Sequence, residues 1–279
     1  MSDGRAMIGE VGTVSTCSHL DLAAALTAAG QRVDLLATDC PYSAEVHAGH
    51  GTMERHGTST PPAYDGAERR EIDYAHWTPA DVDVFVETWE PLTRGWFCAM
   101  ADDELALAWK AALRNAGRLV FPLIPCTERG ATVRLAGEGP SSCTTFLIVA
   151  RPRTVEAMRM AVSLSYESHY VGPRERKPVI GGKPLWLARA IVEDYSAPDS
   201  IACDPCAGGG SFLVAAKMSG RRWIGGDCDA AHVEIARKRL AETVPCDARG
   251  TPIGGAKGRS EALAWGDDYA APAARKAGA

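Results

Sequence analysis

The alternation of short apolar runs with helical segments constrains this chain most. Short apolar runs bounded by polar turns are typical of buried parallel strands. They fall at residues 33–38, 95–100, 118–124, 142–150, 200–205 and 221–227. Helical segments lie between or beside them, at 20–30, 78–92, 103–115, 184–196, 211–220 and 230–244. The alternation predicts an α/β fold with a doubly wound, mostly parallel sheet.

The chain shows no internal repeat and no clear linker, so residues 1–245 are predicted to form one domain. Its 279 residues are enough for a single full core. Three regions depart from the regular pattern. Residues 43–76 are predicted to form a long polar loop, 151–182 an irregular basic segment, and 246–279 a partly disordered tail. Loops as long as 43–76 inside a domain are often functional.

Composition places the chain among globular proteins, with 46% hydrophobic and 23% charged residues. No apolar run approaches the roughly 20 residues that span a bilayer, and the first residues do not resemble a secretory signal. We therefore expect a cytoplasmic protein with no membrane partner. The nine cysteines are odd in number and scattered, which favours free thiols in a reducing compartment over a disulfide framework.

Charge bears on a nucleic-acid partner in two opposing ways. The net charge is −5, which argues weakly against binding to phosphates. The stretch 151–189, however, holds eight lysines and arginines against three glutamates, a local excess of five. The total charge can therefore hide a local basic patch suited to nucleic acid; the alternative is a solvated basic face.

One candidate site is a glycine-rich turn between an apolar run and a helix. It reads Asp204-Pro-Cys-Ala-Gly-Gly-Gly-Ser211, and Asp227 ends the next apolar run. Glycines allow close approach to the main chain, and a helix N-terminus favours polar or anionic groups. An acid at the end of the following strand suits ribose hydroxyls. The spacing indicates a nucleoside-bearing cofactor; the alternative is a tight strand–helix junction.

A second candidate site follows the run 33–38 and reads Thr38-Asp-Cys-Pro-Tyr42. In doubly wound folds, sites lie at the carboxyl ends of parallel strands. The Asp39 carboxylate can accept a hydrogen bond from an amino group, and the Tyr42 ring can stack on a heterocycle. The alternative is an ordinary turn with a partly buried tyrosine.

Taken together, these motifs resemble those of the amino-group DNA methyltransferases, which act on adenine N6 or cytosine N4. Residues 38–42 resemble the (D/N)PPY signature of that family. Lys183-Pro184, Asp204–Ser211 and Gly225–Asp229 resemble its lysine-proline helix, DPFxGxG turn and acidic strand end. The catalytic motif comes first, as in the circularly permuted β group. The resemblance covers roughly residues 30–42 and 95–245.

The resemblance implies a Rossmann-like fold and a methyl transfer that depends on S-adenosyl-L-methionine (SAM). It also implies a DNA substrate whose target base is flipped out. The amino-acceptor motif suggests adenine N6. Only about 30 residues, 151–182, separate the two halves, which is short for a target-recognition domain, so relaxed or very short sequence specificity is expected. Asp39 and the Cys40 carbonyl would accept hydrogen bonds from the target amino group. Pro41 would hold the turn, and Tyr42 would stack on the base.

The resemblance also implies a set of cofactor-binding residues. Asp204 and the glycines would cradle the methionine part of SAM, Asp227 would bind the ribose, and Lys183 with Pro184 would begin a covering helix. The full set is Lys183, Pro184, Asp204, Cys206, Ala207, Gly208, Gly209, Gly210, Ser211 and Asp227.

The chain departs from the family pattern at three places. Cys40 replaces a proline, Cys206 replaces an aromatic residue, and Ser15–Ser18 stand where an acidic motif is usual. No metal site is expected, because Cys203, Cys206 and Cys228 fall short of a four-ligand zinc set. Cytosine N4, RNA or a small molecule remain alternative targets. A catalytically inactive nucleic-acid-binding relative is the alternative from another class, and homodimerisation stays open.

Overall fold

The computed structural model describes residues 7–46, 74–129, 143–154 and 166–245. The strands are β1 (Thr13–Thr16), β2 (Val33–Thr38), β3 (Thr93–Ala101), β4 (Leu119–Val120), β5 (Ile124–Arg129), β6 (Thr144–Arg151), β7 (Tyr170–Pro173), β8 (Ile201–Asp204) and β9 (Arg222–Asp227). The helices are α1 (His19–Ala28), α3 (Pro79–Trp89), α4 (Asp103–Asn115), α6 (Leu185–Tyr195), α7 (Ser211–Met218) and α8 (Ala230–Glu242). The expected tail, 246–279, and most of the expected loop, 43–76, lie outside the described residues.

The described strands form one sheet in the order β1-β9-β8-β2-β3-β6-β5-β7, with β4 paired to β6. The pairs from β1 to β3 are parallel, as is β5 with β7. Only β6 runs against its neighbours β3, β4 and β5. The mostly parallel, doubly wound α/β fold expected from the sequence is confirmed.

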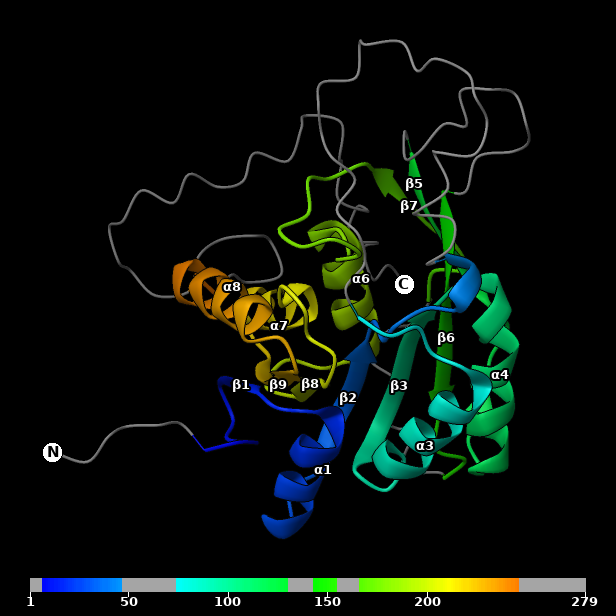
Figure 1. The fold of residues 1–279 in the computed structure, drawn as a ribbon, viewed down its shortest axis with the longest axis horizontal. Coiled ribbons are helices and arrows are strands. Elements are labelled where there is room, and N and C mark those ends of the chain that lie inside the picture. The colour runs from blue at the N-terminus through cyan, green and yellow to red at the C-terminus, as the bar shows by residue number, and fades with distance from the viewer. Residues whose placement is uncertain (1–6, 47–73, 130–142, 155–165, 246–279) are drawn as a thin grey trace, which may run out of the picture.

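Helices cover both faces of the sheet (Figure 1). Alternate residues of β3 point to opposite sides, as strand geometry requires. Trp96 and Cys98 join the buried cluster that also contains residues of α6, α7 and α8. Phe97 and Ala99 join the cluster that contains residues of α1, α3 and α4. The sheet therefore separates two cores.

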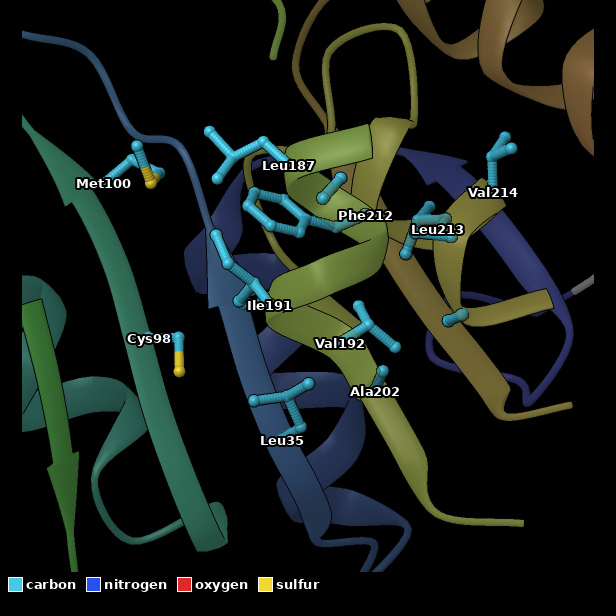
Figure 2. Close-up of a cluster of buried hydrophobic side chains, with 14 of the residues drawn as sticks. Leu35, Cys98, Met100, Leu187, Ile191, Val192, Ala202, Phe212, Leu213 and Val214 are labelled. Atoms are coloured by element: carbon cyan, nitrogen blue, oxygen red, sulfur yellow. The ribbon is translucent and has the colours of Figure 1, made fainter. Parts of the chain in front are cut away.

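Helix α6 packs on the centre of the sheet and sets the position of the residues that precede it. Leu187 and Ile191 belong to the first core together with Leu35 of β2 and Cys98 of β3 (Figure 2). All four are at most 2% exposed. Fully burying a large aliphatic side chain contributes about 1.5–3 kcal/mol, so this shared core holds α6 against the face of the sheet.

The second core is built largely from aromatic rings. Phe85 of α3 stacks on Trp89 at 6.0 Å and meets Trp109 of α4 edge-on at 5.4 Å between centroids. Phe97 of β3 lies 6.3 Å from Phe85 in a T-shaped arrangement. Aromatic pairs of this kind add about 0.5–1.5 kcal/mol beyond their buried area. They hold α3 and α4 on the face opposite α6.

Several expected helix limits are confirmed by capping contacts. Asp102 accepts a hydrogen bond from the Leu105 N–H at 2.9 Å, and Asp229 accepts one from Ala231 at 2.7 Å. Both satisfy otherwise unpaired groups in a first helical turn. Helix α3 begins at Pro79 as expected but ends at Trp89 rather than near residue 92. No helix in the described ranges is long and apolar enough to cross a membrane.

Three predictions made from the sequence are wrong. The expected strand 118–124 is broken: β4 covers only Leu119–Val120, and β5 starts at Ile124. Pro122 lies between them and has no N–H to donate to a ladder. Residues 151–182 are not wholly irregular, because they contain β7, although 155–165 lie outside the described part. Strand β1 was not expected at all.

Candidate active site

The two motifs singled out from the sequence lie at the point where the strand order reverses. From β2 the chain proceeds to β3 on one side, whereas β8 leads to β9 on the other, and β2 and β8 are neighbours (Figure 1). Doubly wound folds bind ligands beyond the carboxyl ends of the strands at such a switch point. Asp39, Asp204 and Asp227 stand at the ends of β2, β8 and β9 respectively.

Asp204 connects the two motifs. Its Oδ1 accepts a hydrogen bond from the Thr38 hydroxyl at 3.1 Å and one from the Cys206 N–H at 3.2 Å. The residue is 2% exposed. Burial raises the pKa of the Asp204 carboxyl well above its ordinary value, because the charged form loses its water. A cation placed beside this carboxyl would favour its ionised form.

Replacing Asp204 with asparagine is expected to raise the melting temperature of the ligand-free protein near neutral pH by a few degrees. In a protein of this size, each kcal/mol added to the free energy of unfolding raises the melting temperature by roughly 2–4 °C. A raised pKa in the folded state means that stability is lost as pH rises from the ordinary carboxyl range through the folded-state pKa. Asparagine stays neutral and still offers an oxygen to Thr38. Thermal melts from about pH 4 to about pH 8 check this. The two curves should converge at the acid end; a variant that melts lower near neutral pH contradicts the argument.

Asp227 ties the glycine turn to the end of β9. Its Oδ2 accepts a hydrogen bond from the Gly208 N–H at 2.7 Å, and its Oδ1 accepts one from the Asp229 N–H at 2.9 Å. The side chain is 13% exposed. A carboxylate has about four lone-pair sites, so Asp227 keeps capacity for hydroxyl donors from a ligand.

The glycines of the turn are required by close packing. Gly210, the N-cap of α7, has a φ of +77°, and a Cβ there would lie 2.8 Å from the Cβ of Ala236. A Cβ at Gly209 would lie 3.0 Å from Pro178 and 3.2 Å from Val179. A positive φ and such short approaches exclude larger side chains. The turn is thus enclosed by α8 on one side and residues 178–179 on the other.

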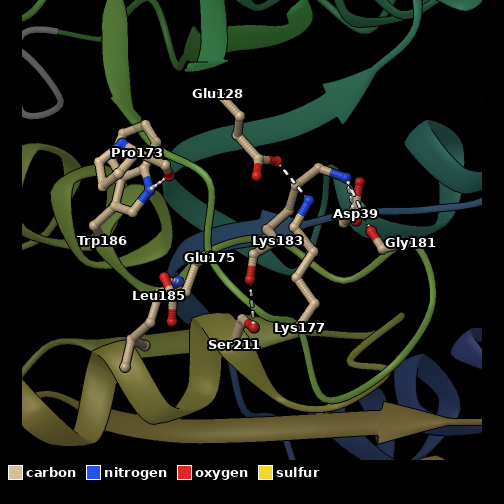
Figure 3. A network of polar contacts seen from close by, with 10 residues as sticks. All are labelled: Asp39, Glu128, Pro173, Glu175, Lys177, Gly181, Lys183, Leu185, Trp186 and Ser211. Atoms are coloured by element: carbon tan, nitrogen blue, oxygen red, sulfur yellow. Dashed lines mark hydrogen bonds and ion pairs between the residues drawn. The ribbon is translucent and has the colours of Figure 1, made fainter. Parts of the chain in front are cut away.

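Lys183 makes an ion pair across the site. Its Nζ donates to Asp39 Oδ2 at 2.7 Å and to the Gly181 carbonyl at 3.3 Å (Figure 3). The two charged side chains are only 8% and 16% exposed. The same ammonium lies 4.8 Å from the centre of the Tyr42 ring, within the range of a cation–π interaction.

Two buried polar atoms beside this ion pair are left without partners. Asp39 Oδ1 and the Tyr42 hydroxyl have no hydrogen-bond partner among the described residues. Burial, and next the negative charge of Asp39, raise the pKa of Tyr42 well above its ordinary value, so the phenol is neutral. Unsatisfied buried polar atoms cost free energy, so these two atoms are candidate contacts for a ligand group.

Further polar contacts fix the segment that carries Lys183 (Figure 3). The Ser211 hydroxyl donates to the Lys183 carbonyl at 2.9 Å. Glu175 accepts a hydrogen bond from the Leu185 N–H at 2.8 Å, at the start of α6. Trp186 donates to the Pro173 carbonyl at 3.0 Å. The 38–42 motif, the start of α6 and the glycine turn therefore belong to one connected network.

The remaining predicted residues also lie in this region. Cys40 and Cys206 bring their sulfur atoms to 3.2 Å. Pro184 is the N-cap of α6, and the Ala207 N–H donates to the Gly226 carbonyl at 2.9 Å. Pro41 continues the turn between Cys40 and Tyr42. The structure thus brings the predicted residues together; their roles stay predictions.

Sequence reasoning missed two features of the site. Thr38 is fully buried and bonded to Asp204; a polar residue at the end of an apolar strand was the available signal. Residues 15–18 lie next to the end of β9, because Thr16 pairs in register with Asp227 and the Cys17 N–H donates to the Asp227 carbonyl at 2.9 Å. The segment in place of the usual acidic motif therefore borders the candidate site.

Comparison with known families identifies the class of protein. A family model described as DNA methylase, covering N6 and N4 methyltransferases, matches residues 87–238, more than half of the chain. The chain therefore belongs to the family of amino-group DNA methyltransferases.

Individual relatives agree with this assignment. YubD of Escherichia coli (strain K12), named as a methylase, is 33% identical over 141 residues, covering 50% of this chain and 57% of YubD. The match thus spans little more than half the length of that relative. Among solved structures, M1.HpyAVI in complex with SAM has a TM-score of 0.61 at 15% identity, covering 82% of this chain and 98% of its own. The cytosine-N4-specific PvuII DNA methyltransferase has a TM-score of 0.53 at 10% identity, covering 82% and 90%. The fold is that of these enzymes.

Proposed function

We propose that this protein transfers a methyl group from SAM to an exocyclic amino group of a DNA base, and that this group is N6 of adenine. The observation that carries the proposal is the meeting of the Asp39 motif and the Asp204–Asp227 motif at one strand-order switch point. One motif offers acceptors for an amino group, and the other offers carboxylates and glycine backbone for a nucleoside cofactor.

The residues at the glycine turn fit SAM. Asp227 retains lone pairs for ribose hydroxyls after binding Gly208 and Asp229. Asp204, buried and with a raised pKa, would be ionised by the cationic amino acid part of the ligand. The crystal structure of the M1.HpyAVI–SAM complex, similar in fold, supports the same cofactor here. When bound, SAM supplies an electrophilic methyl group on its sulfonium sulfur.

The residues of the 38–42 motif would hold the target base. The unpartnered Oδ1 of Asp39 and the Cys40 carbonyl would accept the two N–H groups of the amino group. These contacts raise electron density on the nitrogen and orient its lone pair, and Asp39 provides a place for the proton that leaves after transfer. The Tyr42 ring would stack on the base. Catalysis then rests on orientation rather than on a strong base.

Lys183 acts, in this proposal, on Asp39 rather than on the cofactor, because its ammonium orients the carboxylate through Oδ2 and leaves Oδ1 free. Lys183→Met is expected to lower kcat by roughly 10–100-fold, in line with the loss of a charged hydrogen bond. Affinity for SAM should change little, and Lys183→Arg should restore part of the rate. Calorimetry with SAM and steady-state kinetics measure the two effects. A weakened SAM affinity with unchanged kcat would return Lys183 to the cofactor role expected from the sequence.

Exposed arginines beside the site suit a DNA backbone. Arg129 ends β5, and Arg174, just beyond β7, donates its N–H to the Arg129 carbonyl at 3.2 Å. Arg174, Arg176 and Arg129 are all exposed. Their guanidinium groups would contact phosphates, which position the duplex without reading sequence. This agrees with relaxed or short sequence specificity. The histidines of the long loop, His47, His50 and His56, lie outside the described residues.

The test is transfer of a labelled methyl group from SAM to unmethylated DNA, followed by nuclease digestion and nucleoside mass spectrometry. N6-methyladenine is the expected product. N4-methylcytosine would keep the reaction and overturn the target, an outcome in line with the similarity to the PvuII enzyme. SAM binding without any DNA product would reject the proposed substrate in favour of RNA, a small molecule or an inactive relative.

A further inference from the structure

Two departures from the family pattern meet in space. Cys40, in place of a proline, and Cys206, in place of an aromatic residue, are 166 positions apart in the chain, yet their sulfur atoms lie 3.2 Å from each other. Cys40 is 3% exposed and also approaches the Thr38 hydroxyl at 3.4 Å. Cys206 is partly exposed. The thiol pair joins the end of β2 to the glycine turn after β8.

We infer that Cys40 and Cys206 form an oxidative modification site, which a small-molecule disulfide such as oxidised glutathione converts into an internal disulfide that suppresses methyl transfer. The thiolate of Cys206 attacks the small disulfide, releasing one small thiol and leaving a mixed disulfide. The thiolate of Cys40 then attacks the Cys206 sulfur and releases the second small thiol. Two protein thiols lose two electrons and two protons, and the small disulfide is reduced to two thiols.

The positions of the two sulfur atoms favour this sequence of steps. As a residue Cys206 is partly exposed whereas Cys40 is buried, so the scheme has the oxidant react with Cys206 first, and Cys40 is already in contact with it. Contact with Cys40 and then burial raise the pKa of the Cys206 thiol well above its ordinary value. Because the thiolate is the attacking species, the cross-link should form slowly near neutral pH and faster as pH rises.

The cross-link would disturb the geometry of transfer, and this part of the inference rests on the proposed function. A disulfide holds its sulfur atoms about 2.0 Å apart, so bond formation pulls the two turns together from a 3.2 Å contact. The target amino group and the cofactor would lie between residues of those turns. Misplacement of reacting groups by about 1 Å can cost roughly 10²-fold in rate.

The test oxidises the full chain with oxidised glutathione over a range of pH, blocks free thiols, and maps disulfides by non-reducing peptide mass spectrometry. Methyl transfer is measured before oxidation, after it, and after dithiothreitol. Cys206→Ser removes the site, and each variant is normalised to its own reduced activity. Cys203→Ala, which removes a 1% exposed thiol three residues away, is the matched control. Glutathione on the exposed Cys228 shows that the oxidant was effective.

The inference expects a Cys40–Cys206 peptide in the wild type and in Cys203→Ala, none in Cys206→Ser, and a roughly 10²-fold reversible loss of activity only where the link forms. Glutathione on Cys228 with no Cys40–Cys206 link overturns it, as does a link that leaves activity unchanged. A reduced protein that transfers no methyl group would reject the proposed function instead, while the peptide map would still decide whether the modification site exists.

Discussion

Asp39→Ala is expected to lower methyl transfer by roughly 10²–10⁴-fold, the range in which positioned acid–base groups act, and to leave SAM affinity within about threefold. The reason is that Asp39 provides the free Oδ1 for the target amino group, whereas its other carboxylate oxygen is bonded to Lys183 and not to the glycine turn. Asp103→Ala, an exposed aspartate in the first turn of α4, is a matched control that should keep full activity.

The expected result can be separated from a loss of folding. Asp39→Ala leaves the buried ammonium of Lys183 without its partner, and breaking a buried ion pair in this way can cost about 3–5 kcal/mol. The double variant Asp39→Ala/Lys183→Met removes both charges, so it should melt higher than Asp39→Ala alone yet remain inactive. A folded double variant that methylates at the wild-type rate would show that Asp39 has no catalytic role.

How much of the structure can be predicted from the sequence depends on how far apart in the chain the interacting residues lie. The ends of β2 and β9 and the caps of α4 and α8 follow from local signals, such as the apolar run 33–38 and the aspartates Asp102 and Asp229. These signals act within one turn or one strand, so no knowledge of the partner element is needed. Strands β1 (TVST) and β7 (YVGP) were missed because, unlike the equally short β8 (IACD), they contain too few apolar residues to stand out as an apolar run.

The contacts across the site could not be predicted from the sequence, for a different reason. Lys183 and Asp39 are 144 positions apart, and Thr38 and Asp204 are 166 apart. They meet because β8 is inserted beside β2 in the sheet, and strand order is not encoded in any local pattern. The resemblance predicted which motifs belong to the site, but it assigned Lys183 to the cofactor and treated Cys40 and Cys206 as separate departures.

The second large effect is expected at Asp227. Asp227→Ala should weaken SAM binding by roughly 10–100-fold, because charge-assisted hydrogen bonds contribute about 1.5–3 kcal/mol and about 1.4 kcal/mol is tenfold in affinity. At saturating SAM the rate of methyl transfer should largely recover, since the hydrogen bonds of the Asp227 carboxylate go to Gly208 and Asp229 and not to the 38–42 motif. Calorimetry and the dependence of rate on SAM concentration measure these two quantities.

The structure also gives Asp227 a second task, which a control must separate from ligand binding. Its carboxylate accepts the Gly208 and Asp229 N–H groups, so the variant loosens the turn as well as removing an acceptor. Asp229→Ala removes the cap of α8, worth about 1 kcal/mol, two residues away. If Asp229→Ala weakens SAM binding as much as Asp227→Ala does, the effect at Asp227 comes from the turn and not from the ribose. If only Asp227→Ala weakens it, the cap of α8 is not the cause, and Asp227→Asn, which keeps an oxygen for the Gly208 N–H, then separates the glycine turn from the cofactor. Weakened SAM binding in Asp227→Asn as well, together with a rate-only defect at Asp39, means that the two motifs divide the reaction between cofactor binding and transfer.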